Sequence, residues 1–93
     1  MKSINRYHRR VTEWLSQAGI SYMEEYPVGR WSLDVWLPEF RLGLEIDGPS
    51  HSWVKDKERD EKILDTYGIP IIRIPVGSKK KLVMDTILKW NSQ

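Results

Sequence analysis

The 93-residue sequence contains no cysteine. Disulfide bonds and thiolate metal sites are therefore excluded, and any metal ion must be bound through oxygen or imidazole ligands. Long apolar runs are also lacking, since none approaches the roughly 20 residues of a membrane-spanning helix. The N-terminal MKSINRYHRR has no apolar core of the kind that a signal peptide needs. We therefore expect a soluble, intracellular (cytoplasmic) protein with no membrane partner.

An excess of charge of one sign is lacking too, because 15 lysines and arginines stand against 13 aspartates and glutamates, a formal net charge of +2. The basic residues are nevertheless clustered. Arg9 and Arg10 belong to a basic N-terminal segment, and Lys79 and Lys80 belong to a lysine run near the C-terminus. Each cluster is either a contact for the phosphates of a nucleic acid or a solvated helix end or loop.

Hydrophobic residues, at 40% of the chain and including five tryptophans, are enough for one modest core. The length leaves no room for a second core, so we expect a single domain over residues 1–93. Local patterns predict helices at about 3–17, 55–67 and 81–90 and strands at about 20–28, 31–37, 42–47 and 69–75. The order α-β-β-β-α-β-α predicts an α/β sandwich around a small mixed sheet. The β-branched last strand suits a central position, parallel to its neighbour.

Two carboxylates follow one another on the strand within the stretch LGLEIDGPSH. Apolar residues alternate on one face of this strand, so Glu45 and Asp47 share the other face. A four-residue loop would place Asp34 of the preceding strand opposite Glu45. These hard oxygen ligands suit Mg²⁺, or Mn²⁺ as a substitute, and the backbone carbonyl of Ile46 is a further candidate ligand. The alternative is a pair of solvent-facing acids that an arginine neutralises.

Two further polar residues are expected near this strand end. His51 follows it after a Gly-Pro turn, and Asp60 lies on the predicted inner stripe of the next helix with Ile63, Leu64 and Tyr67. One buried polar residue is routine, but several polar groups that converge at one place indicate chemistry. A histidine there can act as general base or general acid, because the reference pKa of histidine is about 6.5.

The ordered set SLDVWLPEFRLGLEIDGPSH, followed by a charged helix and by GIPIIRI, resembles the very short patch repair-like branch of the PD-(D/E)XK nuclease superfamily. Within it, the sequence is most similar to homing endonucleases whose active-site motif is written EDxHD. The resemblance covers residues from about 13 to 74 and implies a restriction-endonuclease-like three-layer sandwich. It also implies a Mg²⁺-dependent endonuclease of a bacterium or phage that nicks or cuts duplex DNA. Such a chain would be the catalytic domain of an enzyme whose DNA-recognition domain is separate.

Carried over residue by residue, the resemblance implies active-site roles for Glu13, Asp34, His51 and Asp60. Glu13 would hold a metal-bound water, and Asp60 would orient His51. The (D/E)XK triad corresponds to Glu45-Ile46-Asp47, so an aspartate stands where the motif has lysine. The missing basic group is then His51 or a residue of the following helix, where helical phasing favours Lys57.

Arg73, in the last strand, either contacts a phosphate or pairs with a buried carboxylate. The predicted DNA contacts are Arg9, Arg10, Arg73, Lys79 and Lys80. Two other functions stay open. The segment EIDGPSH also resembles the RAP domain, which implies a non-catalytic nucleic-acid-binding module. A small phage or toxin protein that uses the fold for protein contacts is a third reading, and the oligomeric state is left open.

Overall fold

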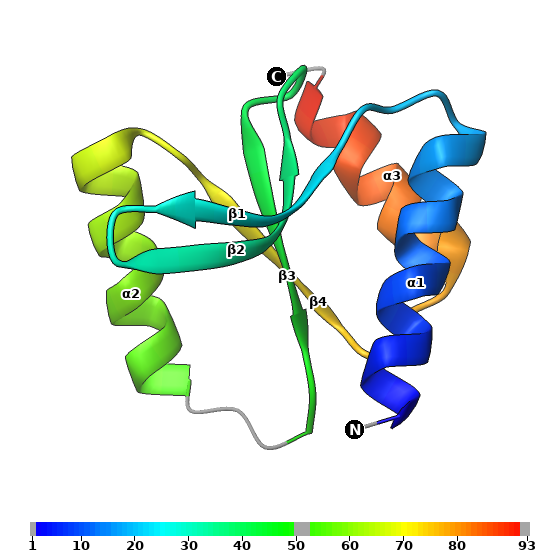
Figure 1. The fold of residues 1–93 in the computed structure, drawn as a ribbon, viewed down its shortest axis with the longest axis horizontal. Coiled ribbons are helices and arrows are strands. Elements are labelled where there is room, and N and C mark those ends of the chain that lie inside the picture. Colours follow the sequence, from blue (N-terminus) through cyan, green and yellow to red (C-terminus); the bar gives the residue numbers. More distant parts are fainter. Residues whose placement is uncertain (1, 50–52, 92–93) are drawn as a thin grey trace.

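The computed structural model describes residues 2–49 and 53–91 and has a four-stranded sheet between two layers of helices (Figure 1). The elements are α1 (Lys2–Gln17), β1 (Met23–Val28), β2 (Trp31–Leu37), β3 (Leu42–Asp47), α2 (Trp53–Tyr67), β4 (Ile71–Pro75) and α3 (Lys80–Asn91). Helices α1 and α3 lie side by side on one face of the sheet, and α2 covers the other. The predicted fold class and element order are confirmed. No helix in the described part of the chain is long and apolar enough to cross a bilayer.

The β2–β3 hairpin has the register that a four-residue loop predicts. Its ladder pairs Leu37 with Leu42 and Val35 with Leu44, and the loop ends at Arg41, which has a φ of 50°. Leu42 and Leu44 are buried in the core below α1 and α3. Because side chains alternate along a strand, the acidic residues of β3 lie on the opposite face, toward α2.

Strand β4 runs parallel to β3, as predicted, but it stands at an end of the sheet order β1-β2-β3-β4. The prediction of a central strand was wrong. It rested on the apolar, β-branched run, and an end strand needs the same run here because helices cover both of its faces. Ile74 is buried on the α1–α3 side, and Ile71 packs against the core on the α2 side. An end position also suits Pro70, which precedes the strand, and Pro75, its last residue, because proline cannot donate a hydrogen bond to a ladder.

The larger core lies between the sheet and the layer of α1 and α3. Val11 and Leu15 of α1 and Ile87 of α3 are fully buried there. The hydroxyl of Tyr7 donates a hydrogen bond to the Ser78 carbonyl at 2.7 Å, which ties α1 to the loop between β4 and α3. These contacts make one side of the sheet an apolar platform.

Helix α2 is attached to the sheet by a much smaller apolar contact. Ile63 is fully buried in a second core with Leu33 and Trp36. Leu64 and Tyr67, predicted on the same inner stripe, are 48% and 44% exposed. The helix is instead rotated so that half-buried charged side chains, those of Asp56, Arg59 and Asp60, face the sheet together with Ile63.

Replacement of Ile63 by alanine should lower the free energy of unfolding by about 3 kcal/mol, because a fully buried side chain leaves a cavity. Leu64→Ala, one position further along α2, should cost less than about 1 kcal/mol because half of that side chain already faces solvent. Urea denaturation of both variants measures the difference. Equal losses would mean that α2 is rotated as its apolar pattern alone predicts.

Candidate active site

The regular ladder between β2 and β3 stops at Val35 and Leu44, and the next two residues bind across the gap through their side chains. The backbone N–H of Asp34 donates to Oε2 of Glu45 at 2.6 Å. In return, the N–H of Ile46 donates to Oδ2 of Asp34 at 2.8 Å. Asp34 therefore lies opposite Glu45, as predicted, and each carboxylate is fixed by the backbone of the other strand.

Strand β1 also departs from regular pairing beside Asp34. The register pairs Glu24 with Val35 and Tyr26 with Leu33, and it passes over Glu25 and Asp34 between them. Glu25 has a φ of 52°, a left-handed conformation that is uncommon outside glycine. Such irregular backbone gathers at functional sites. Both neighbours of β2 are thus irregular at the same acidic residue.

Burial raises the pKa of the Glu45 carboxyl to about 7. The hydrogen bond from the Asp34 N–H opposes this rise, the charge of the Asp34 carboxylate adds to it, and the charges of Arg59 and Arg73 oppose it. The side chain of Glu45 is 13% exposed. A cation placed next to Glu45 would therefore stabilise its ionised form.

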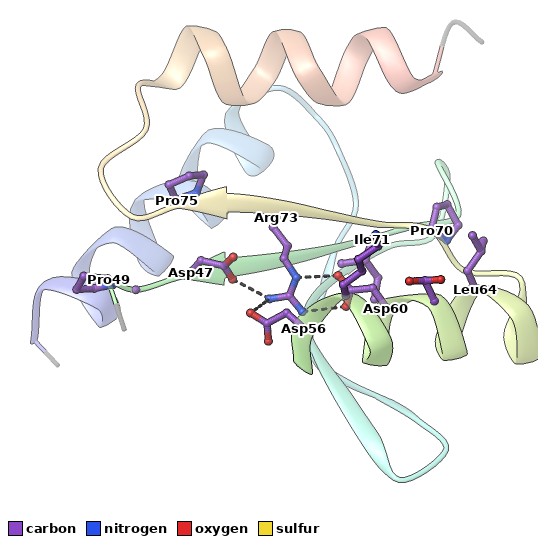
Figure 2. A pocket seen from close by; sticks show the side chains of 12 residues that line it. Asp47, Pro49, Asp56, Asp60, Leu64, Pro70, Ile71, Arg73 and Pro75 are labelled. Atoms are coloured by element: carbon purple, nitrogen blue, oxygen red, sulfur yellow. Dashed lines mark hydrogen bonds and ion pairs between the residues drawn. The ribbon is translucent and has the colours of Figure 1, made fainter. Parts of the chain in front are cut away.

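Arg73 of β4 lies beside Glu45 in the parallel ladder and gathers three carboxylates (Figure 2). Its Nε and Nη2 donate to Asp60 at 2.7 and 2.8 Å, and its Nη1 donates to Asp47 at 2.9 Å and lies 3.4 Å from Asp56. The hydrogen bonds to Asp60 raise the pKa of Arg73 above its ordinary value. Of the two predicted roles for Arg73, the structure shows pairing with carboxylates, and these are half-buried. Asp60, predicted to orient the histidine, has both of its oxygens bound by arginine.

A second arginine, Arg59 of α2, was not predicted. Its Nη2 donates to the Ser32 carbonyl at 2.7 Å and lies 3.3 Å from Oε1 of Glu45. Its Nη1 donates to Oδ1 of Asp60 at 3.2 Å. Position 59 precedes the buried Ile63 by one helical turn. The helical spacing alone could therefore have placed Arg59 on the face of α2 that turns toward the sheet. Lys57, favoured instead from the sequence, is exposed and lines the cavity between α2 and the strands β3 and β4.

A cavity of about 610 Å³ opens beside these ion pairs, between α2 and the strands β3 and β4 (Figure 2). Its charged wall includes Asp47, Asp56 and Arg73, and its apolar wall includes Leu64 and Ile71. Sites for small ligands and substrates have volumes in this range. The ion pairs thus border a space that can admit part of a substrate.

The remaining predicted site residues are not among those that surround Arg73 and Glu45 in the described part of the chain. His51 is outside the described residues. Glu13 is exposed on α1, in the layer on the opposite face of the sheet from α2, so the structure does not bring it together with Asp60. The other predicted DNA contacts, Arg9, Arg10, Lys79 and Lys80, are all exposed.

No protein-family model matches the chain, and no curated protein matches it. Among solved structures, the chain is similar to the catalytic domain of the homing endonuclease I-Bth0305I, with a TM-score of 0.59. The two sequences are 21% identical, and the match covers 91% of this chain and 86% of the other. At this identity the likeness shows a shared fold, which agrees with the nuclease-like architecture expected from the sequence.

The donor chemistry of Asp34 and Glu45 fits a hard divalent cation. Within residues 2–49 and 53–91, no three carboxylate or imidazole groups are arranged to surround an ion, and Asp47 is bound to Arg73. Mg²⁺, however, is commonly held by one or two protein carboxylates, while water and substrate phosphate supply its other ligands. The two carboxylates of Asp34 and Glu45, held where the β2–β3 ladder stops, meet that requirement.

Glu45→Gln should make stability less dependent on pH. In the folded protein the pKa of Glu45 is raised from 4.5 to about 7, so its protonated form stabilises the fold at low pH, and this stabilisation is lost as the pH rises through about 7. Glutamine stays neutral and can still accept the hydrogen bond from Asp34. As the pH rises from about 5 to about 8, the free energy of unfolding of the variant should therefore increase by about 2 kcal/mol relative to that of wild type, after allowance for partial exposure. Urea unfolding at both pH values measures this, and a constant difference would contradict it.

Proposed function

We propose that this chain is the catalytic domain of a metal-dependent endonuclease that hydrolyses phosphodiester bonds of duplex DNA. The observation that carries the proposal is the Asp34–Glu45 pair, in which two carboxylates are locked together where β2 and β3 separate. The fold that the chain shares with a homing endonuclease catalytic domain supports it. Assignment to the very short patch repair-like, EDxHD-type nucleases rests on the resemblance in sequence.

The charge balance of the site supports a requirement for a cation. Five half-buried carboxylates stand against two half-buried guanidinium groups, namely Asp34, Glu45, Asp47, Asp56 and Asp60 against Arg59 and Arg73. Three negative charges are left when all of these groups are ionised. A DNA phosphate would be repelled by this excess, and a divalent cation would reduce it to one.

In the proposed reaction, Asp34 and Glu45 would hold Mg²⁺, or Mn²⁺ in its place, and the Ile46 carbonyl is a further candidate ligand. Once bound, such an ion supplies Lewis acidity and lowers the pKa of a water molecule. His51, which follows β3 in the chain, is proposed to transfer the proton to or from the reacting oxygen. The position of Glu13 on α1 lends no support to the role first expected for it.

An exposed basic surface lies where the two charged clusters of the sequence meet. The hydrogen bond from Tyr7 to Ser78 brings the lysine run beside α1. Burial raises the pKa of Tyr7, and the hydrogen bond to Ser78 and the charge of Arg10 oppose this rise, so Arg10 acts on the same place. Lys79 and Lys80 adjoin the same loop, and Lys80 reaches Gln17 of α1 at 3.5 Å. We propose that DNA phosphates bind this surface.

A non-catalytic nucleic-acid-binding module is the second candidate. The observation in its favour is that Arg59 and Arg73 already neutralise part of the acidic cluster, as a purely structural ion-pair network would. The negative charge that remains argues against this second candidate, because excess acidic residues repel the phosphates that a binding module must attract.

Asp34→Asn separates these two candidates. Wild-type protein should nick supercoiled plasmid in Mg²⁺ and should lose this activity in EDTA. The asparagine variant keeps an oxygen that can accept from Ile46 but lacks the charge, so we expect its rate to fall by a factor of about 100 or more. Gel analysis of plasmid forms over time measures the rate. Equal cleavage by the variant would refute the metal assignment, and DNA binding without any cleavage by wild type would favour the second candidate.

Arg10→Ala combined with Lys79→Ala should weaken DNA binding and make it less dependent on salt. Loss of two phosphate contacts should reduce the slope of log affinity against log salt by about 2. Lys62→Ala combined with Lys89→Ala removes the same charge from exposed positions elsewhere and should leave the slope unchanged. Fluorescence anisotropy with a labelled duplex over a salt series measures both. The same reduction in the two double variants would show an effect of net charge rather than of this surface.

A further inference from the structure

Arg59 of α2 joins three parts of the candidate site, and the roles proposed above do not use it. Its guanidinium donates to the Ser32 carbonyl of β2 at 2.7 Å and to Asp60 of its own helix at 3.2 Å, and it lies 3.3 Å from Glu45 of β3. The side chain of Arg59 is 19% exposed and that of Glu45 13%, so water competes little for the contact between them. Arg59 therefore fixes the spacing between β2, β3 and α2 at the acidic cluster.

The two oxygens of Glu45 show what this spacing controls. Oε2 accepts from the Asp34 N–H at 2.6 Å, and Oε1 faces Arg59 at 3.3 Å. The last torsion of a glutamate side chain is intrinsically loose. A carboxylate bound at both oxygens from two directions is held in one orientation, whereas loss of either contact lets it turn.

A lysine in this position would not replace Arg59. Two different nitrogens of the guanidinium plane are used, Nη2 for Ser32 and Glu45 and Nη1 for Asp60. A lysine ammonium is a single point charge on a flexible stem and cannot span this set of acceptors. The contacts thus depend on the forked shape of the group as well as on its charge.

We propose that Arg59 is a positioning residue that fixes the Glu45 carboxylate against β2, in the place of the motif lysine for which the sequence favoured Lys57. Its consequence for catalysis rests on the proposed nuclease function, whereas its effect on Glu45 does not. An orientation held in this way keeps the Asp34–Glu45 pair in one geometry, and small displacements of catalytic groups are costly in rate.

Amide hydrogen exchange of the whole chain, followed by NMR, tests the effect on Glu45 without any activity. In Arg59→Met, which keeps an apolar stem, the Asp34 N–H should exchange about tenfold faster or more, because its acceptor is no longer held. Arg59→Lys should show the same acceleration. The Gly43 N–H, which donates to the Pro70 carbonyl at 3.0 Å, should keep its rate in both variants. Lys62→Ala, at an exposed position of α2, should leave all rates unchanged.

Three results would overturn the proposal. An unchanged Asp34 rate in Arg59→Met would show that Glu45 is held without the arginine. A wild-type rate in Arg59→Lys would show that charge alone is enough. Uniformly faster exchange of all protected amides would show that Arg59 only stabilises the fold.

Single-turnover nicking of supercoiled plasmid in Mg²⁺, with protein in excess, tests the consequence for catalysis. Both Arg59 variants should cleave about 10 to 100 times more slowly, with DNA affinity within about threefold of wild type. Lys62→Ala should cleave at the wild-type rate. A parallel loss of DNA affinity would show that Arg59 binds phosphate directly and would overturn the positioning role. If wild-type protein does not cleave while the Asp34 exchange is still accelerated locally, the nuclease proposal fails and the positioning of Glu45 stands.

Discussion

The α2 side of the molecule depends on the point at which β2 and β3 separate. Beyond Val35 and Leu44 the register pairs no further residues of the two strands, and the carboxylates of Asp34 and Glu45 accept hydrogen bonds from the backbone of the opposite strand. A buried N–H without an acceptor is costly, so neither acid can turn away freely. In a continuous ladder both N–H groups would be occupied, and the same side chains would lack this anchorage.

Two acids fixed at a half-buried place need positive charge beside them, and the neighbouring elements supply it. Strand β4 supplies Arg73 and α2 supplies Arg59, and both reach Asp60. This explains the rotation of α2. Its charged side chains turn to the sheet while Leu64 stays half exposed, because unpaired buried charge costs more than an apolar side chain in water.

The sequence predicted those features that follow from local rules. The alternation of side chains and the length of one loop were enough to place Asp34 opposite Glu45. The position of β4 at the end of the sheet was not predictable, because a β-branched run is the same in any strand covered on both faces. Arg59 was overlooked because an amphipathic stripe is read from apolar residues, and Leu64 outweighed an arginine in that reading. The carboxylates that Arg73 binds could not be predicted either. They depend on the conformation of its long side chain, which the register of the strand does not determine.

The two layers on either side of the sheet hold the chain together in different ways. Between the sheet and α1 and α3, burial of residues such as Val11 and Leu44 supplies an apolar core. Among residues 54–67 of α2, Ile63 is the one fully buried side chain, and much of the remaining attachment is ionic. A small domain can keep an acidic cluster because its apolar burial is concentrated on the other face. The ion pairs that neutralise the acids are also the contacts that hold α2 on the sheet. A change in the charge balance at the site would therefore also change the placement of the helix.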